Sequence, residues 1–132
     1  MLGIKQERWL HSELQASRAR WNILANQVQM SAVDRAAGPE ELYGMDSWAG
    51  YDAARRRLVA ALRDTKVSNP VVITGDIHSN WVGDLKIDPR DEHAAVIGTE
   101  LTGTSISTGG DGNDIPAEVA AYVAEKLSDQ VL

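Results

Sequence analysis

Apolar and polar residues follow two different spacings along this chain, and the two spacings predict helices and strands in turn. Over residues 4–17, Trp9, Leu10 and Leu14 form one apolar stripe among good helix formers. From Tyr51 onward, apolar residues again recur at helical spacing, with arginines mostly on the opposite side. We therefore predict an amphipathic helix in each of these two segments.

Short apolar runs between and after these helices predict buried strands. Segment 21–30 is apolar with interspersed amides, and segment 71–75 follows a Ser-Asn-Pro connection. Two further short strands are predicted at 85–87 and 94–101, and a last helix at about 116–127. The order helix, strand, helix, strand, strand, strand, helix indicates an α/β fold with a mixed sheet.

Composition limits the class of protein and its partners. A chain of 132 residues with 43% hydrophobic residues suits a single domain over 1–132. The net charge is −6, without a long block of like charges, so no nucleic acid binding is predicted. The absence of cysteine leaves oxygen and imidazole ligands for any metal. No apolar run approaches the ~20 residues of a membrane span, and the first residues do not resemble a signal peptide.

The strand at 71–75 ends at a glycine and then presents a carboxylate and an imidazole. An apolar strand that delivers Asp76 and His78 at its end is where α/β proteins commonly place hydrolytic or metal sites. We expect Gly75 to let the backbone bend so that both side chains face one cavity. The Asp-x-His pattern by itself is equally consistent with a metal or catalytic site and with a hydrogen-bonded turn.

The residues around this strand end favour a ligand site. Polar side chains and the aromatic ring of Trp81 flank it, a mixture typical of pockets. Trp48 could also border a substrate, but buried aromatic rings usually only pack, and we predict a packing role for Trp48. Thr104 and Ser105 follow the next predicted strand and are candidates to donate hydrogen bonds to a bound phosphate. We predict Trp81, Thr104 and Ser105 as substrate-binding residues.

Several other polar residues favour structural roles. Asp46 is predicted to cap the helix that begins near Tyr51, with a role in shaping the pocket as the alternative, and Asn26 to satisfy backbone groups. His11 and His93 have no ligand partners at a recognisable spacing and are predicted to be solvated. Residues 109–114 match the Gly-Gly-x-Gly-x-Asp pattern of calcium-binding β-rolls, but a single copy cannot stack, and we interpret it as a loop.

Five blocks of the sequence resemble consecutive blocks of the PhoD-like alkaline phosphatases, in the same order and at similar spacing. The blocks lie at residues 1–10, 20–27, 45–51, 73–81 and 98–106. The fourth block contains Thr74-Gly75-Asp76-Ile77-His78, which looks like the family's Thr-Gly-Asp-x-His signature. On this resemblance the sequence is identified as a member of the family.

The resemblance implies part of a metallophosphoesterase-type α/β/β/α sandwich that hydrolyses phosphomonoesters or phosphodiesters. It also implies a centre containing iron and calcium, with other divalent metals as alternatives. By position, Asp76 and His78 match the family's late pair of metal-site residues, so we assign both as metal ligands and catalytic residues. A bound metal polarises the phosphate and activates a water or hydroxide, so no protein nucleophile is required.

Two features of the family pattern are not present in this sequence. These are a Gly-Asp-x-Arg strand end and an Asp-Asp-His-Glu stretch, which precede the matched blocks in family members. We therefore expect the chain to be the C-terminal half of a catalytic domain, with the missing N-terminal half as its partner. The alternative is a noncatalytic remnant that serves as a binding or structural module. Family members are often exported, but this chain does not fix the location.

Overall fold

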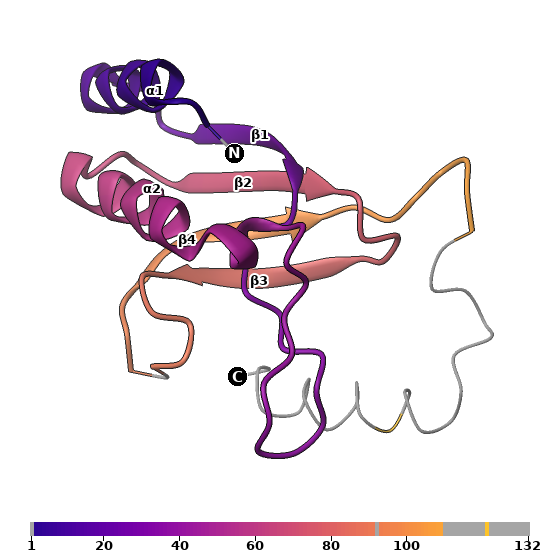
Figure 1. Cartoon of the computed structure of the whole chain (residues 1–132). Coiled ribbons are helices and arrows are strands. Elements are labelled where there is room, and N and C mark those ends of the chain that lie inside the picture. The colour runs from indigo at the N-terminus through magenta and orange to yellow at the C-terminus, as the bar shows by residue number, and fades with distance from the viewer. Residues whose placement is uncertain (1, 92, 110–120, 122–132) are drawn as a thin grey trace.

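Four strands form one mixed sheet in this protein, and two helices cover one face of it (Figure 1). The computed structural model describes residues 2–91, 93–109 and 121. The elements in chain order are α1 Ile4–Ala16, β1 Asn22–Val28, the short 3-10 helix η1 Trp48–Tyr51, α2 Asp52–Thr65, β2 Pro70–Gly75, β3 Trp81–Lys86 and β4 Val96–Thr102. The strand order is β1-β2-β4-β3, with β1, β2 and β4 parallel and β3 antiparallel to β4. The predicted mixed α/β fold is confirmed.

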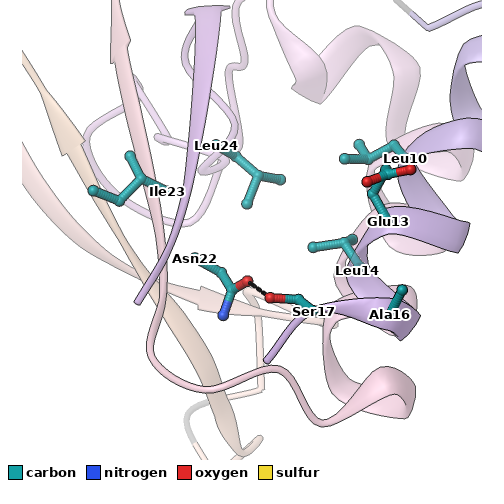
Figure 2. A pocket seen from close by; sticks show the side chains of 8 residues that line it. All are labelled: Leu10, Glu13, Leu14, Ala16, Ser17, Asn22, Ile23 and Leu24. Atoms are coloured by element: carbon teal, nitrogen blue, oxygen red, sulfur yellow. Dashed lines mark hydrogen bonds between the residues drawn. The ribbon is translucent and has the colours of Figure 1, made fainter. Parts of the chain in front are cut away.

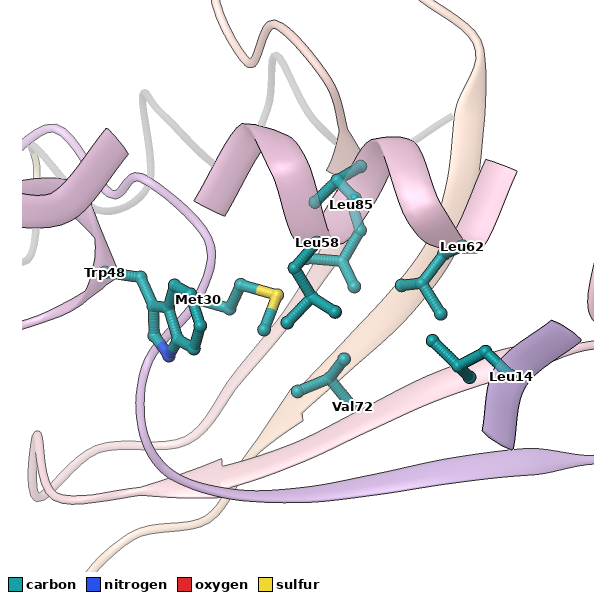
Figure 3. Close-up of a cluster of buried hydrophobic side chains, with 8 residues drawn as sticks. Leu14, Met30, Trp48, Leu58, Leu62, Val72 and Leu85 are labelled. Atoms are coloured by element: carbon teal, nitrogen blue, oxygen red, sulfur yellow. The ribbon is translucent and has the colours of Figure 1, made fainter. Parts of the chain in front are cut away.

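The core lies between α2 and the inner face of the sheet (Figure 3). Apolar residues at helical spacing give α2 a buried face, which contacts β4 and shares one apolar cluster with Val72 of β2 and Leu85 of β3. Lys66, at φ 53°, ends the helix in the left-handed conformation. The buried apolar side chains are Leu14, Met30, Trp48, Leu58, Val59, Leu62, Val72 and Leu85.

The opposite face of the sheet carries exposed apolar side chains. Ala25, Ile73, Leu101 and Val82 are register partners and form one row across all four strands. Val82 is 74% exposed, and Ile73 and Leu101 are each more than 40% exposed. The described residues therefore supply one sheet and its helices, and the second sheet of the implied sandwich is not among them.

The four predicted strands all differ from the observed ones in their bounds. Strand β1 is shorter than the predicted 21–30, and β2 begins one residue before the predicted 71–75. The strand predicted at 85–87 is β3, which begins at Trp81, because pairing with β4 overrides the low strand preference of Gly83 and Asp84. The strand predicted at 94–101 is β4, shifted by one or two residues. The helix predicted at 116–127 and the motif at 109–114 lie outside the described residues, except for residues 109 and 121.

The prediction that Asp46 caps the helix beginning near Tyr51 is wrong, because Tyr51 itself is at the cap position of α2 and no side chain caps it. Ser47 occupies the cap of η1, where its Oγ accepts a hydrogen bond from the Ala49 N–H at 3.3 Å. The same hydroxyl donates to the Gly44 carbonyl oxygen at 2.8 Å. A short side chain directly before the helix suits both contacts, and Asp46 lies one residue too early.

Arg55 is buried in α2, with 1% of its surface exposed, and it connects this helix to the end of β3. Its guanidinium donates to the carbonyl oxygens of Lys86 and Ile87 at 3.1 and 3.0 Å, and to Asp52 at 3.0 Å. The backbone carbonyl oxygens of Lys86 and Ile87 therefore accept hydrogen bonds from Arg55 of α2. These bonds hold the end of β3 against the helix.

Replacing Arg55 with methionine should lower the free energy of unfolding by about 2 kcal/mol, because two backbone carbonyls lose a charged donor. Urea unfolding followed by circular dichroism measures this loss. Arg57→Ala is the matched control, since the ion pair of Arg57 with Glu7 lies at the surface and should contribute little. Similar losses for the two variants would contradict the role of Arg55.

None of the helices in the described part of the chain is long and apolar enough to cross a membrane.

Candidate functional site

The carboxyl ends of three parallel strands meet at one edge of the sheet. Asp76 and His78 follow β2, and the segment from Gly103 to Gly109 follows β4. The chain after β1, at Met30, reaches the same edge. In open α/β sheets this edge is the usual position of ligand sites.

The turn after β2 has an unusual backbone conformation. Asp76 has φ 77° and His78 has φ 60°, so two non-glycine residues are left-handed within three positions. This conformation costs energy for residues with a Cβ, although Asp and His adopt it more readily than most, and residues strained in this way cluster at functional sites. The expectation that Gly75 provides the bend is wrong, because its φ is not positive. The bend lies at the two candidate ligands themselves.

Replacing Asp76 with glycine should raise the free energy of unfolding by about 0.5–1 kcal/mol, because relief of the left-handed strain exceeds the entropic cost of glycine. Urea unfolding of the chain measures the gain. Ser79→Gly in the same turn is the comparison and should only lose stability, since Ser79 does not have a positive φ and its hydroxyl accepts a hydrogen bond from Trp81. Any loss of stability for Asp76→Gly would show that the turn stores no strain at Asp76.

His78 is held in one orientation by the backbone of the loop after β4. Its Nδ1 lies 2.7 Å from the Gly109 carbonyl oxygen. Because a carbonyl oxygen can only accept, we assign the proton to Nδ1, which leaves the lone pair on Nε2. A backbone contact of this kind is how proteins commonly orient a histidine that binds a metal through its other nitrogen.

The Asp76 side chain is exposed, and in the described part of the chain its carboxylate has no hydrogen-bond or ion-pair partner. A carboxylate and an imidazole nitrogen are therefore both available to a metal at this turn. Residues 2–91 and 93–109 contain no group of three His, Asp or Glu side chains that could hold a metal ion. Most metal sites need four to six ligands, so two residues provide part of one.

The loop after β4 is hydrogen-bonded to the turn after β2. The Thr104 hydroxyl donates to the His78 carbonyl oxygen at 2.8 Å, and the Thr104 N–H donates to Asn80 Oδ1 at 3.0 Å. The Gly103 N–H donates to the Thr74 carbonyl oxygen at 2.9 Å. These bonds make the two loops one structural unit.

The three residues predicted to bind substrate lie in or beside this unit. The Ser105 hydroxyl donates to the Thr108 carbonyl oxygen at 2.8 Å, within its own loop. Trp81 is half-buried, and its Nε1–H donates to the Ser79 hydroxyl at 2.7 Å. Together with the bonds of Thr104, these contacts give all three side chains a role in holding the loops. Their contact with substrate stays a prediction.

Sequence reasoning missed a buried carboxylate beneath this edge. Glu100 of β4 is 1% exposed, and its Oε1 accepts from the Met30 N–H at 2.7 Å and from the Thr74 hydroxyl at 3.0 Å. Its Oε2 accepts from the Ser31 N–H at 2.6 Å. The Thr74 hydroxyl also lies 2.9 Å from that of Thr102. Glu100 thus joins β2, β4 and the chain after β1, and its partner on β2 is Thr74, two residues before Asp76.

The remaining structural interpretations of the sequence are confirmed. Trp48 packs in the core with 3% of its surface exposed, and the Asn26 amide donates to the Val28 carbonyl oxygen at 2.9 Å. His11 and His93 are exposed. None of these four residues belongs to the candidate site.

The fold of this chain matches that of a protein of known structure. The solved structure of PhoD superimposes with a TM-score of 0.82 at 37% sequence identity, and the match covers 94% of this chain and 24% of that one. The mixed sheet therefore belongs to a metallophosphoesterase-like α/β fold.

A sequence model of the PhoD-like phosphatases matches residues 1–131, and the chain belongs to this family. Alkaline phosphatase D of Bacillus subtilis (strain 168) is 37% identical over 125 residues, which make up 95% of this chain and 21% of that protein. The chain thus spans between a fifth and a quarter of the length of the relatives that it matches.

Proposed function

We propose that this chain supplies part of the active site of a phosphoric ester hydrolase of the alkaline phosphatase or phosphodiesterase type, with Asp76 and His78 as metal ligands. Membership of a phosphatase family supports the reaction class. The observation that carries the assignment is the turn after β2, where the contact between His78 Nδ1 and Gly109 leaves Nε2 available, and where the Asp76 carboxylate, two residues earlier, has no partner among the described residues.

The donor set fits a hard or borderline metal. A carboxylate oxygen and an imidazole nitrogen suit iron, and the carboxylate also suits calcium, while zinc and manganese accept the same pair. We propose iron and calcium as the natural metals. When bound, a metal would polarise the phosphoryl oxygens and acidify a water molecule for attack on phosphorus.

The residues of the chain itself would then position the groups that react. The Gly109 carbonyl fixes the His78 ring, and Thr104 ties the His78 backbone to the loop after β4. We propose that Trp81, Thr104 and Ser105 border a small phosphomonoester or phosphodiester at this edge. Phosphoryl transfer needs mainly positioning and charge compensation, which such a rigid pair of loops provides.

The other metal ligands would come from polypeptide beyond this chain. Two donors cannot complete a metal site, and the described residues offer no third acidic or histidine partner. The same observation supports a second candidate function for the chain by itself, a noncatalytic binding or structural module. We propose that turnover requires the N-terminal half of a PhoD-like domain.

A chimera tests the proposal, in which this chain replaces the matched segment of Bacillus subtilis alkaline phosphatase D. We expect the metal-loaded chimera to hydrolyse p-nitrophenyl phosphate or bis-p-nitrophenyl phosphate, and the chain alone to hydrolyse neither. A folded, metal-loaded chimera without activity on either ester would overturn the proposed function. Activity of the isolated chain would overturn the proposal that its site is partial.

A further inference from the structure

Glu100 is a buried carboxylate whose hydrogen-bond partners carry no positive charge. It is 1% exposed, and it accepts from the N–H groups of Met30 and Ser31 and from the hydroxyl of Thr74. Because all three partners donate, the contacts fit the ionised carboxylate, which can only accept. In the part of the chain that the structure describes, no lysine, arginine or histidine forms an ion pair with it. Buried charges in proteins are usually paired or lie at metals, and this one lacks a cation.

The described residues contain one other buried charged side chain, and that side chain has a partner of opposite charge. Arg55 forms an ion pair with Asp52 at 3.0 Å. Two hollows beside α1, of about 310 and 230 Å³, are lined mainly by α1 and β1 (Figure 2), and Glu100 lines neither of them. These hollows therefore do not offer a place for a cation beside Glu100.

Hydrogen bonds connect Glu100 with both loops of the candidate site. Its partner Thr74 is two residues before Asp76, and two residues of chain span at most about 7 Å. The Thr74 hydroxyl also lies 2.9 Å from the hydroxyl of Thr102, which is buried. The Gly103 N–H, directly after Thr102, donates to the Thr74 carbonyl oxygen at 2.9 Å. Glu100 is therefore bonded to the last part of β2, and through it to the end of β4, where each strand enters its loop.

The same carboxylate holds the chain that follows β1. Its Oε1 accepts from the Met30 N–H at 2.7 Å, and its Oε2 accepts from the Ser31 N–H at 2.6 Å. One side chain thus fixes the carboxyl ends of three parallel strands relative to one another. Metal ligands bind well only when the residues around them hold their geometry, and Glu100 is placed to do this for the turn after β2.

We propose that Glu100 is a positioning residue for the metal centre at this edge, and that its buried charge is compensated when a metal is bound there. Both of its oxygens already accept hydrogen bonds from the chain, so it is not one of the metal ligands. It acts through Thr74 on the turn that carries Asp76 and His78, and its negative charge favours a cation across a protein interior of low dielectric constant. The inference rests on the metal site of the proposed function.

Binding of Mn²⁺ to the metal-free chimera, measured by isothermal titration calorimetry, tests the proposal. Mn²⁺ is the probe because it accepts a carboxylate and an imidazole. Glu100→Gln removes the charge at nearly constant size and should raise the Kd by about 10- to 100-fold. Thr74→Val keeps the charge but removes the hydroxyl that connects Glu100 to β2, and it should raise the Kd roughly tenfold. Unchanged Kd values for folded Glu100→Gln and Thr74→Val would overturn the proposal, and Thr74→Val alone decides if Glu100→Gln does not fold.

Arg55→Met is the control that separates positioning from stability. It also removes a buried charged side chain and should destabilise the protein, but Arg55 bonds to the end of β3 that is opposite to Trp81 and the candidate site. Its Kd for Mn²⁺ should therefore stay within about twofold of that of the unmodified chimera. A rise as large as that for Glu100→Gln would show that metal affinity only follows stability, and would overturn the proposal.

His78→Ala in the same titration allows this inference and the proposed function to fail separately. If His78→Ala weakens Mn²⁺ binding while Glu100→Gln and Thr74→Val do not, His78 stands as a ligand and the role of Glu100 is overturned. If only Glu100→Gln and Thr74→Val weaken binding, Glu100 supports a metal at this edge and His78 is not its ligand. A chimera that shows the expected Kd values without turnover would support the role of Glu100 and overturn the proposed reaction.

Discussion

Replacing His78 with alanine in the active chimera should lower kcat/KM for p-nitrophenyl phosphate at least about 100-fold. The imidazole is held with Nε2 free by its contact with the Gly109 carbonyl oxygen, so its removal takes away a metal ligand that was already oriented. The bound metal should decrease in parallel, which elemental analysis of the purified protein measures. The loss should appear mainly in kcat.

The control for this change is His93→Ala in the same chimera. His93 is exposed and lies outside the candidate site, so activity and metal content should stay at the level of the unmodified chimera. If His78→Ala retained full activity and metal content while the protein stayed folded, His78 would not be a ligand. A loss of activity without loss of metal would instead place His78 at the substrate.

Replacing Glu100 with glutamine should lower the free energy of unfolding of the chain by about 3 kcal/mol, the largest stability effect that we expect here. The side chain keeps its shape, but one carboxylate oxygen becomes an amide nitrogen. Whichever way the amide turns, a donor then faces the N–H of Met30 or Ser31, and a buried group is left unpaired. Urea unfolding measures the loss.

Glu40→Gln is the matched control, since Glu40 is exposed and the same chemical change there should leave stability nearly constant. Equal midpoints for Glu100→Gln and the unmodified chain would show that the buried contacts of Glu100 contribute no stability.

Helices α1 and α2 and the order of the four strands could be predicted because their signal is local. Apolar spacing over a few turns identifies α1 and α2, and an apolar run identifies β2. Strand β3 was predicted too short, since its strand character comes from pairing with β4 and not from Gly83 or Asp84. The local sequence therefore predicts which helices and strands form, but it predicts their first and last residues less well.

The candidate site was predicted in part, for the same physical reason. The positions of Asp76 and His78 follow from the end of an apolar run, but their left-handed backbone does not, because a glycine stands next to them. Glu100 could not be found, since Met30 and Ser31 are 70 and 69 residues away in the sequence. The bonds of Thr104 to His78 and Asn80 likewise join segments that only the folded sheet brings together.

Helix α1 is attached to the rest of the protein by few buried contacts. Leu14 is the one buried residue of this helix, and the ion pair of Glu7 with Arg57 that joins it to α2 lies at the surface. An element with so few buried contacts opens as a local unit, at a free energy below that of global unfolding. The α1 amides should therefore exchange their hydrogens with solvent while the hydrogen bonds of the sheet stay closed.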